Sequence, residues 1–315
     1  MTVFAREANG PISDDAKTHR ASLQPYPVLD VWMNPVTRGL ARKLTKQDLA
    51  KSLKEIDFEY RLQDDTIGGV ACTRMETATP AKKDLYLIYV HGGALGNGSP
   101  ESTAAIALPI CRRTGAQTIG INYTSLPEGR FPDQMDDIDA VHDAILSQND
   151  KARIFFIADG IGACFTLSCM LRRRDEGKKL PAGAIFLSGM FDGAGHSDTL
   201  KTLDGHDPLI RAQGGKQGRK LFRYYAPGRK LNDPAVSPVY GNFAGLPPIL
   251  AHVGSREVLL GDTARMMEAA RRAGVVTHLR VFDGMFHQFH MHWRLPETRA
   301  AHEDIGDFIS ALEWS

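Results

Sequence analysis

The amino-acid sequence predicts an α/β fold in which helices flank a mostly parallel sheet of eight strands. Short apolar runs rich in valine, isoleucine and phenylalanine recur along the 315 residues, and amphipathic helical patterns separate them. The runs are almost continuously apolar, as expected for strands that are buried on both faces of a parallel sheet. Strands and helices therefore alternate, which is the repeat from which parallel sheets are built.

Each strand of this sheet can be placed along the chain. The first two strands are expected to form an antiparallel hairpin over 56–62 and 68–75. Six further apolar runs are expected as strands of successive βα units, at 84–90, 117–122, 153–158, 183–188, 248–253 and 277–282.

Two helices between these strands have clear patterns. One spans 133–146 and places its apolar side chains along one stripe, formed by Met135, Ile138, Val141, Ile145 and Leu146. The other is expected to start at a capping Asp262 and to stop at Gly274.

Two segments do not fit the repeat of strands and helices. Residues 1–50 precede the first strand, and residues 191–245 separate two core strands by far more than an ordinary crossover. We expect both segments to form a helical cap over the carboxyl ends of the strands. Residues 51–190 and 246–315 then form the core.

The composition favours a cytoplasmic protein that acts on a small molecule. Hydrophobic residues make up 43% of the chain and the formal net charge is +1, so neither nucleic acid nor a membrane is expected as a partner. The first residues lack the apolar core of a secretory signal, and no apolar run is long enough to span a membrane. The basic run at 171–179 is expected to be a solvated helix end. Four cysteines without metal-ligand spacing are expected as reduced core residues, namely Cys72, Cys111, Cys164 and Cys169.

Four loops at the carboxyl ends of the predicted strands carry the residues suited to chemistry. Ligands of open parallel sheets bind at this edge. His-Gly-Gly at 91–93 can turn backbone N–H groups toward a bound oxygen, although a tight structural turn would have the same sequence. Residues 158–162 form a strand-turn-helix corner with the small residues typical of a nucleophile elbow. Glu257 and His287 follow two later strands, in the chain order of a catalytic triad.

The nucleophile position of this corner is occupied by Gly160. Covalent acyl transfer needs an atom that attacks the carbonyl, and glycine has none. Neither Asp159 nor Cys164 is expected to replace it, because Asp159 should point elsewhere and Cys164 lies a full helical turn away. We expect no metal and no cofactor, since His287, His290 and His292 have no partner at a recognised metal-ligand spacing.

The chain from about residue 84 onward resembles the hormone-sensitive-lipase-like carboxylesterases of the α/β-hydrolase superfamily. HGGA at 91–94 is similar to the HGGG motif of that family, and YTSLPEGRFPDQMDD at 123–137 is similar to its Y-R-L-A-P-E, F-P and D-D stretch. DPAVSPVYGNFAGLPPILAHVGS at 233–255 resembles its approach to the acid-bearing strand. The family's elbow reads G-D-S-A-G or similar, so Gly160 is the departure.

The resemblance implies roles for individual residues. Gly92, Gly93 and Ile161 would donate the N–H groups of an oxyanion hole. Glu257 would orient His287, which would be the general base. The substrate would be a small ester or lactone, bound in an apolar pocket whose lining would include Trp32, Leu95 and Phe191. The resemblance also implies that a homodimer through an edge strand is common.

Three explanations for the missing serine remain open from the sequence. In the first, an esterase or lactonase carries an engineered glycine that leaves substrate intact. In the second, the glycine is native, and Glu257 and His287 perform an elimination, cyclisation or isomerisation without a serine. In the third, the pocket belongs to a small-molecule receptor that has no catalytic activity.

Overall fold

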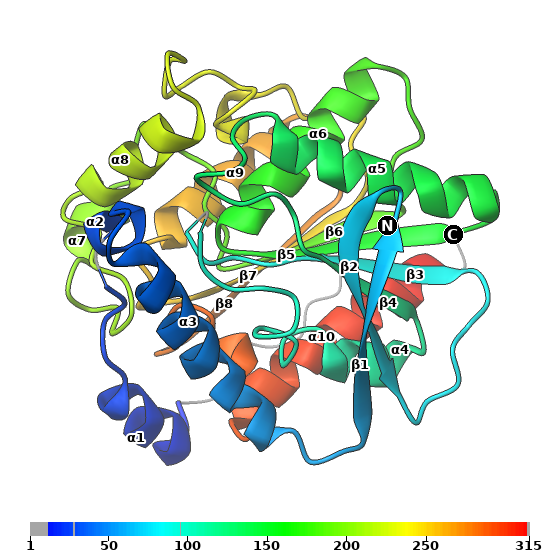
Figure 1. Ribbon diagram of the computed structural model, residues 1–315, viewed down its shortest axis with the longest axis horizontal. Coiled ribbons are helices and arrows are strands. Elements are labelled where there is room, and N and C mark those ends of the chain that lie inside the picture. Colours follow the sequence, from blue (N-terminus) through cyan, green and yellow to red (C-terminus); the bar gives the residue numbers. More distant parts are fainter. Residues whose placement is uncertain (1–11, 28, 95, 314–315) are drawn as a thin grey trace.

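The computed structural model describes residues 12–27, 29–94 and 96–313, and an eight-stranded sheet forms its centre (Figure 1). The strand order is β1-β2-β4-β3-β5-β6-β7-β8. The pairs β1/β2 and β2/β4 are antiparallel, and the other five pairs are parallel. The strands span Tyr60–Ile67, Val70–Thr77, Leu85–Val90, Gln117–Ile121, Arg153–Asp159, Gly183–Leu187, Ile249–Gly254 and Thr277–Phe282 for β1 to β8. The predicted fold class is confirmed.

The amino-terminal hairpin lies further along the chain than the apolar pattern predicts. β1 begins at Tyr60, four residues after the predicted start at 56, and continues to Ile67. Gly68 and Gly69 form the two-residue turn with φ angles of 59° and 81°, which favours glycine at both positions. β1 is an edge strand whose side chains are largely exposed. Its polar second half therefore pairs with β2 without an apolar signal that would reveal it.

Helices cover both faces of the sheet (Figure 1). α4 (Leu108–Thr114) and α10 (Pro296–Glu313) pack on one face. α5 (Asp133–Gln148), α6 (Ile161–Asp175) and α9 (Leu260–Arg272) pack on the other.

The sheet separates two apolar cores, because side chains alternate along each strand. In β3, Leu87 and Tyr89 belong to the core beneath α4 and α10, whereas Ile88 and Val90 belong to the core beneath α5 and α6. The predicted stripe of α5 faces this second core, with Leu146 at its margin. The central strands are thus buried on both sides, as their composition predicts.

The two segments outside the repeat lie side by side at one end of the sheet (Figure 1). The amino-terminal segment contains α1 (Asp14–Ser22), α2 (Leu29–Met33), α3 (Arg38–Leu49) and the 3₁₀ turn η1 (Ala50–Glu55). The insertion between β6 and β7 contains α7 (Thr199–Thr202), α8 (Lys216–Tyr225) and η2 (Pro238–Tyr240). Helices α2 and α8 are in contact. The Tyr26 N–H donates to the carbonyl of Leu209 at 2.9 Å, which joins the two segments directly.

The sequence predicts that the basic run at 171–179 is a solvated helix end, but one of its arginines is buried. Arg173 is 1% exposed and donates to the carboxylates of Asp139 and Asp143 on α5, each at 2.8 Å. Paired carboxylates compensate the guanidinium for its loss of water. This arginine therefore fastens α6 to α5.

The four cysteines are buried and free, as predicted. Among the described residues, no helix has the length and apolarity needed to cross a membrane.

Candidate active site

A sharp turn joins β5 to α6 at Gly160. The backbone there has φ 52° and ψ −122°, and α6 begins at the next residue, Ile161. A Cβ added to Gly160 would lie 3.6 Å from the Cα of Gly92 and 3.8 Å from Nε2 of His287. Space for a side chain therefore exists at this corner, and that side chain would face the imidazole. Gly162 has no such room, since a Cβ there would approach the carbonyl oxygen of Val90 to 2.3 Å.

His287 and Glu257 form a buried pair beside this turn. Nδ1 of the imidazole lies 3.2 Å from Oε2 of Glu257. The other carboxylate oxygen accepts from the Ser188 hydroxyl at 2.8 Å and from the Gly254 N–H at 2.6 Å, so the carboxylate is fixed in place. With Nδ1 held by the acid, Nε2 is the ring nitrogen available to a group at position 160.

The environment favours a protonated imidazole. Burial works against the charged form of His287, but the hydrogen bond and negative charge of Glu257 outweigh it. The pKa of His287 is therefore raised above its ordinary value of 6.5. An imidazole stabilised in this way readily accepts a proton from a neighbouring hydroxyl.

The oxyanion loop differs in one residue from the prediction. The Gly92 N–H donates to Oδ1 of Asp159 at 2.9 Å, so this amide is already engaged and is not free for a substrate oxygen. Gly93 and Ala94 lie in the wall of the cavity, and within the described chain neither of their N–H groups has a hydrogen-bond acceptor. Ile161 opens α6, and its N–H has no acceptor inside the helix. The amides available beside the turn are thus those of Gly93, Ala94 and Ile161.

Asp159 connects the elbow to two residues that the sequence did not reveal. Its carboxylate accepts from the Tyr89 hydroxyl at 2.7 Å and from Nε2 of Gln288 at 2.5 Å. The Tyr26 hydroxyl donates to Oε1 of Gln288 at 3.2 Å. Burial raises the pKa of Asp159 even though these donors lower it. As predicted, Asp159 points away from the nucleophile position, and it ties the amino-terminal segment to the edge of the sheet.

A largely apolar cavity opens in front of Gly160 and His287. It encloses about 1160 Å³, including space open to solvent. Both segments outside the repeat line it, with Tyr26, Leu29, Trp32 and Leu49 from one and Leu209, Ile210 and Leu221 from the other.

The three residues predicted to line this pocket have different outcomes. Trp32 lies in the cavity wall. Phe191 does not: it is fully buried, and its ring packs against Phe186 with a centroid distance of 5.4 Å. The chain turns into the core after β6, which places this aromatic ring behind the cavity. Leu95 falls outside the described residues.

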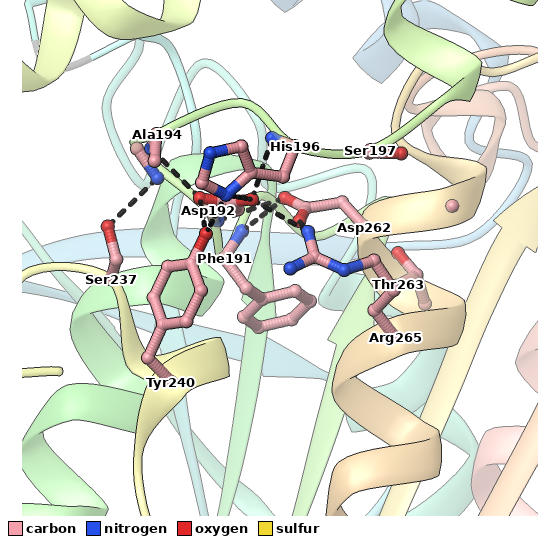
Figure 2. Close-up of polar contacts among 12 residues, drawn as sticks. Phe191, Asp192, Ala194, His196, Ser197, Ser237, Tyr240, Asp262, Thr263 and Arg265 are labelled. Carbon is pink, nitrogen blue, oxygen red and sulfur yellow. Dashed lines mark hydrogen bonds and ion pairs between the residues drawn. The ribbon is translucent and has the colours of Figure 1, made fainter. Parts of the chain in front are cut away.

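A cluster of charged groups fixes the start of the insertion (Figure 2). The Asp192 carboxylate accepts from the Tyr240 hydroxyl at 2.8 Å and from Nη1 of Arg265 at 2.6 Å. Asp262 does not cap α9, which begins at Leu260. Its carboxylate instead accepts the N–H groups of Phe191 and of Asp192, at 2.6 and 3.1 Å. The predicted cap is therefore wrong, because the buried carboxylate of Asp262 binds the backbone after β6 and not the first turn of α9.

The other histidines of the run at 287–292 have separate surroundings. His290 is fully buried and stacks on His252 with a centroid distance of 5.6 Å. His292 lies 3.4 Å from a carboxylate oxygen of Glu55 in the amino-terminal segment. His290 is therefore a packing residue, and His292 contacts the amino-terminal segment.

The strand order, the elbow and the buried acid–histidine pair together define an α/β-hydrolase. A family model described as alpha/beta hydrolase fold matches residues 87–291. The chain belongs to this family, and within it to the hormone-sensitive-lipase-like group.

Curated relatives and a solved structure are similar over most of the chain. An esterase of Acinetobacter venetianus is 33% identical over 241 residues, which cover 76% of this chain and 78% of the esterase. An acetyl-hydrolase of Streptomyces hygroscopicus is 32% identical over 241 residues, covering 76% and 79%. The crystal structure of an esterase from the bacterial hormone-sensitive lipase family aligns with a TM-score of 0.80 at 26% identity, covering 92% of this chain and 93% of the other.

Proposed function

We propose that this chain binds a small, largely apolar ester or lactone in the site of a hormone-sensitive-lipase-like hydrolase, and that Gly160 prevents its cleavage. One observation carries the proposal. His287, held by Glu257, lines the same cavity as Gly93, Ala94 and Ile161, and a Cβ at position 160 would lie 3.8 Å from the imidazole. A serine there would place its hydroxyl one bond further out, within reach of Nε2.

The chemistry follows from this arrangement when a serine is present. Nε2 of His287 takes the hydroxyl proton as the oxygen attacks the ester carbonyl. The free amides stabilise the oxyanion that forms. The imidazolium then protonates the leaving alcohol, and water repeats the sequence on the acyl-enzyme. Without the serine the first bond cannot form, and a loss on the order of 10⁶-fold in kcat is expected.

The test is Gly160→Ser, assayed with short-chain p-nitrophenyl esters and with lactones. We expect turnover with a burst of nitrophenol, because acylation and deacylation become separate steps. Gly160→Ala is the matched control: it adds the same Cβ without an oxygen and should remain inactive. His287→Ala in the serine background should abolish the gain. A folded Gly160→Ser protein that hydrolyses none of these compounds contradicts the proposal.

The intact acid–histidine pair also supports a second candidate, in which the unaltered chain performs acid/base chemistry without a serine. This pair retains a proton acceptor of raised pKa beside an apolar cavity. Conversion of a small molecule by the unaltered chain, lost on His287→Ala, would favour this candidate. A ligand that binds tightly and is recovered unchanged would instead favour a receptor.

A further inference from the structure

Helix α3 has one apolar face toward the core and the cavity, and a second apolar face toward solvent. Ala41 packs on the core, and Thr45 and Leu49 line the cavity at successive intervals of four residues. One position back along the helix, Leu40 and Leu44 point into solvent and are 64% and 55% exposed. Val36, in the turn that precedes α3, is 89% exposed. A single exposed leucine needs no explanation, but three apolar side chains at intervals of four residues form an apolar stripe that begins in this turn and continues along α3.

Basic residues are concentrated in the segment that carries this stripe and in the helix next to it. Residues 29–55 contain six basic and three acidic residues, a net charge of +3. On the neighbouring helix α8 and the loop after it, residues 216–230 contain six basic residues and no acidic one. These two segments therefore carry +9, whereas the whole chain carries +1. Lys43 and Lys46 flank Leu44 on the exposed side of α3.

The helices that carry this charge also form part of the cavity wall. Trp32 of α2 and Leu49 of α3 line the cavity, as do Gly218 and Leu221 of α8. The exposed Tyr224 lies on α8, and Lys220 pairs with Asp30 of α2, which holds the two segments together. Figure 1 shows α2, α3 and α8 together at one end of the molecule. A surface that contacts these helices from outside thus lies directly behind the substrate space.

We propose that this face, formed by α2, α3 and α8 and here called the basic apolar face, docks on an anionic lipid surface. An amphipathic helix with lysines beside an apolar row has the features of interfacial binding, in which leucine and valine enter the boundary of the acyl chains and lysines bind the headgroups. The same face of a second copy does not fit here, because two surfaces of the same positive charge repel. A neutral protein surface would leave the charge without a counterpart. The docking places the cavity beside a region in which apolar esters accumulate.

The experiment measures binding of the unaltered chain to vesicles by co-sedimentation. Vesicles of phosphatidylcholine alone are compared with vesicles containing phosphatidylglycerol at low and at raised salt. Binding is expected to the anionic vesicles and to fall as salt screens the charges. Leu40→Ser with Leu44→Ser should weaken it by at least about 10-fold, since two apolar side chains that become buried on docking are lost. Lys43→Glu with Lys46→Glu should weaken it by a similar or larger factor.

Matched controls keep the test specific. Val276→Ser with Leu279→Ser removes two exposed apolar residues, one just before the edge strand β8 and one within it, and vesicle binding should remain unchanged. The substituted residues of α3 are exposed, so thermal unfolding should show that the variants fold. Equal binding to neutral vesicles, no binding to anionic ones, or binding that survives both double substitutions overturns the proposal. Vesicle binding requires no turnover, so its outcome is separate from that of the Gly160→Ser assay.

Discussion

Nδ1 of His287 lies 3.2 Å from Oε2 of Glu257, and this contact sets the protonation behaviour of the site. The carboxylate raises the pKa of the imidazole against the opposing effect of burial. A general base must be neutral to act, so activity in the Gly160→Ser background should be lost as pH falls through this raised pKa.

Glu257→Gln in the serine background should change the pH profile and the rate together. Without the carboxylate, the pKa of His287 falls and the acidic limb of kcat/KM moves to lower pH. The rate should drop on the order of 10⁴-fold, as when the acid of a triad is replaced by its amide. Glu59→Gln, at an exposed position, is the control and should alter neither. An acidic limb that stays in place would mean that His287 is not the titrating group.

Gly160→Ser should make the protein less stable. The φ of 52° lies in the left-handed region, where a non-glycine residue costs on the order of 1–3 kcal/mol. The free energy of unfolding, measured in urea, should fall by that amount, and Gly160→Ala should show the same loss. Equal stability of all three proteins would show that the turn relaxes when a side chain is present.

Asp159→Ala should destabilise the protein severely. The substitution leaves the Gly92 N–H and Nε2 of Gln288 without their acceptor, and the Tyr89 hydroxyl keeps only Thr103 as a partner. Each unpaired buried group costs about 1–3 kcal/mol. Asp159→Asn keeps an acceptor oxygen and should lose less. Chemical denaturation separates the two variants, and an equal loss in both would contradict the role of the hydrogen bonds.

Asp262 should make stability depend on pH. Burial raises its pKa from 3.8 to about 7, so the folded protein holds this proton more tightly than the unfolded chain. The stabilising contribution is complete below pH about 4 and is lost as pH rises to about 7. Asp262→Asn should remove this dependence, by on the order of 2–4 kcal/mol across the interval. The exposed Asp64→Asn should keep the slope of the unaltered chain, and an unchanged slope in Asp262→Asn would show that another group causes it.

The parts of the site that the sequence predicts are those set by strand ends. Glu257 and His287 follow apolar strands in a fixed order, and the parallel sheet brings their loops together. The direction of a backbone N–H or of a side chain after a turn has no such rule, so the predictions for Gly92 and Phe191 are wrong. The engagement of Gly92 depends on the Asp159 carboxylate, 67 residues away along the chain. The contact between Tyr26 and Gln288 spans 262 residues and leaves no local signal.

The net charge of the sequence likewise does not reveal how charge is distributed over the folded molecule. A net charge of +1 over the chain argues against an anionic partner, yet it averages a strongly basic end of the molecule with an acidic remainder. The spatial neighbourhood of α2 and α8 is needed before that imbalance can be recognised.

The hydrogen bond from Tyr26 to Leu209 has a consequence for how such proteins diversify. The walls of the cavity come from stretches of the gene that encode none of the reacting groups at 160, 257 and 287. Recombination near the start of the gene can therefore exchange one wall while the chemistry is inherited intact. A library of apolar residues at Leu29, Trp32 and Leu49 should accordingly yield new ligand preferences, because these side chains line the cavity. Some loss of stability should accompany it, since the same three side chains are buried at the margins of the two cores.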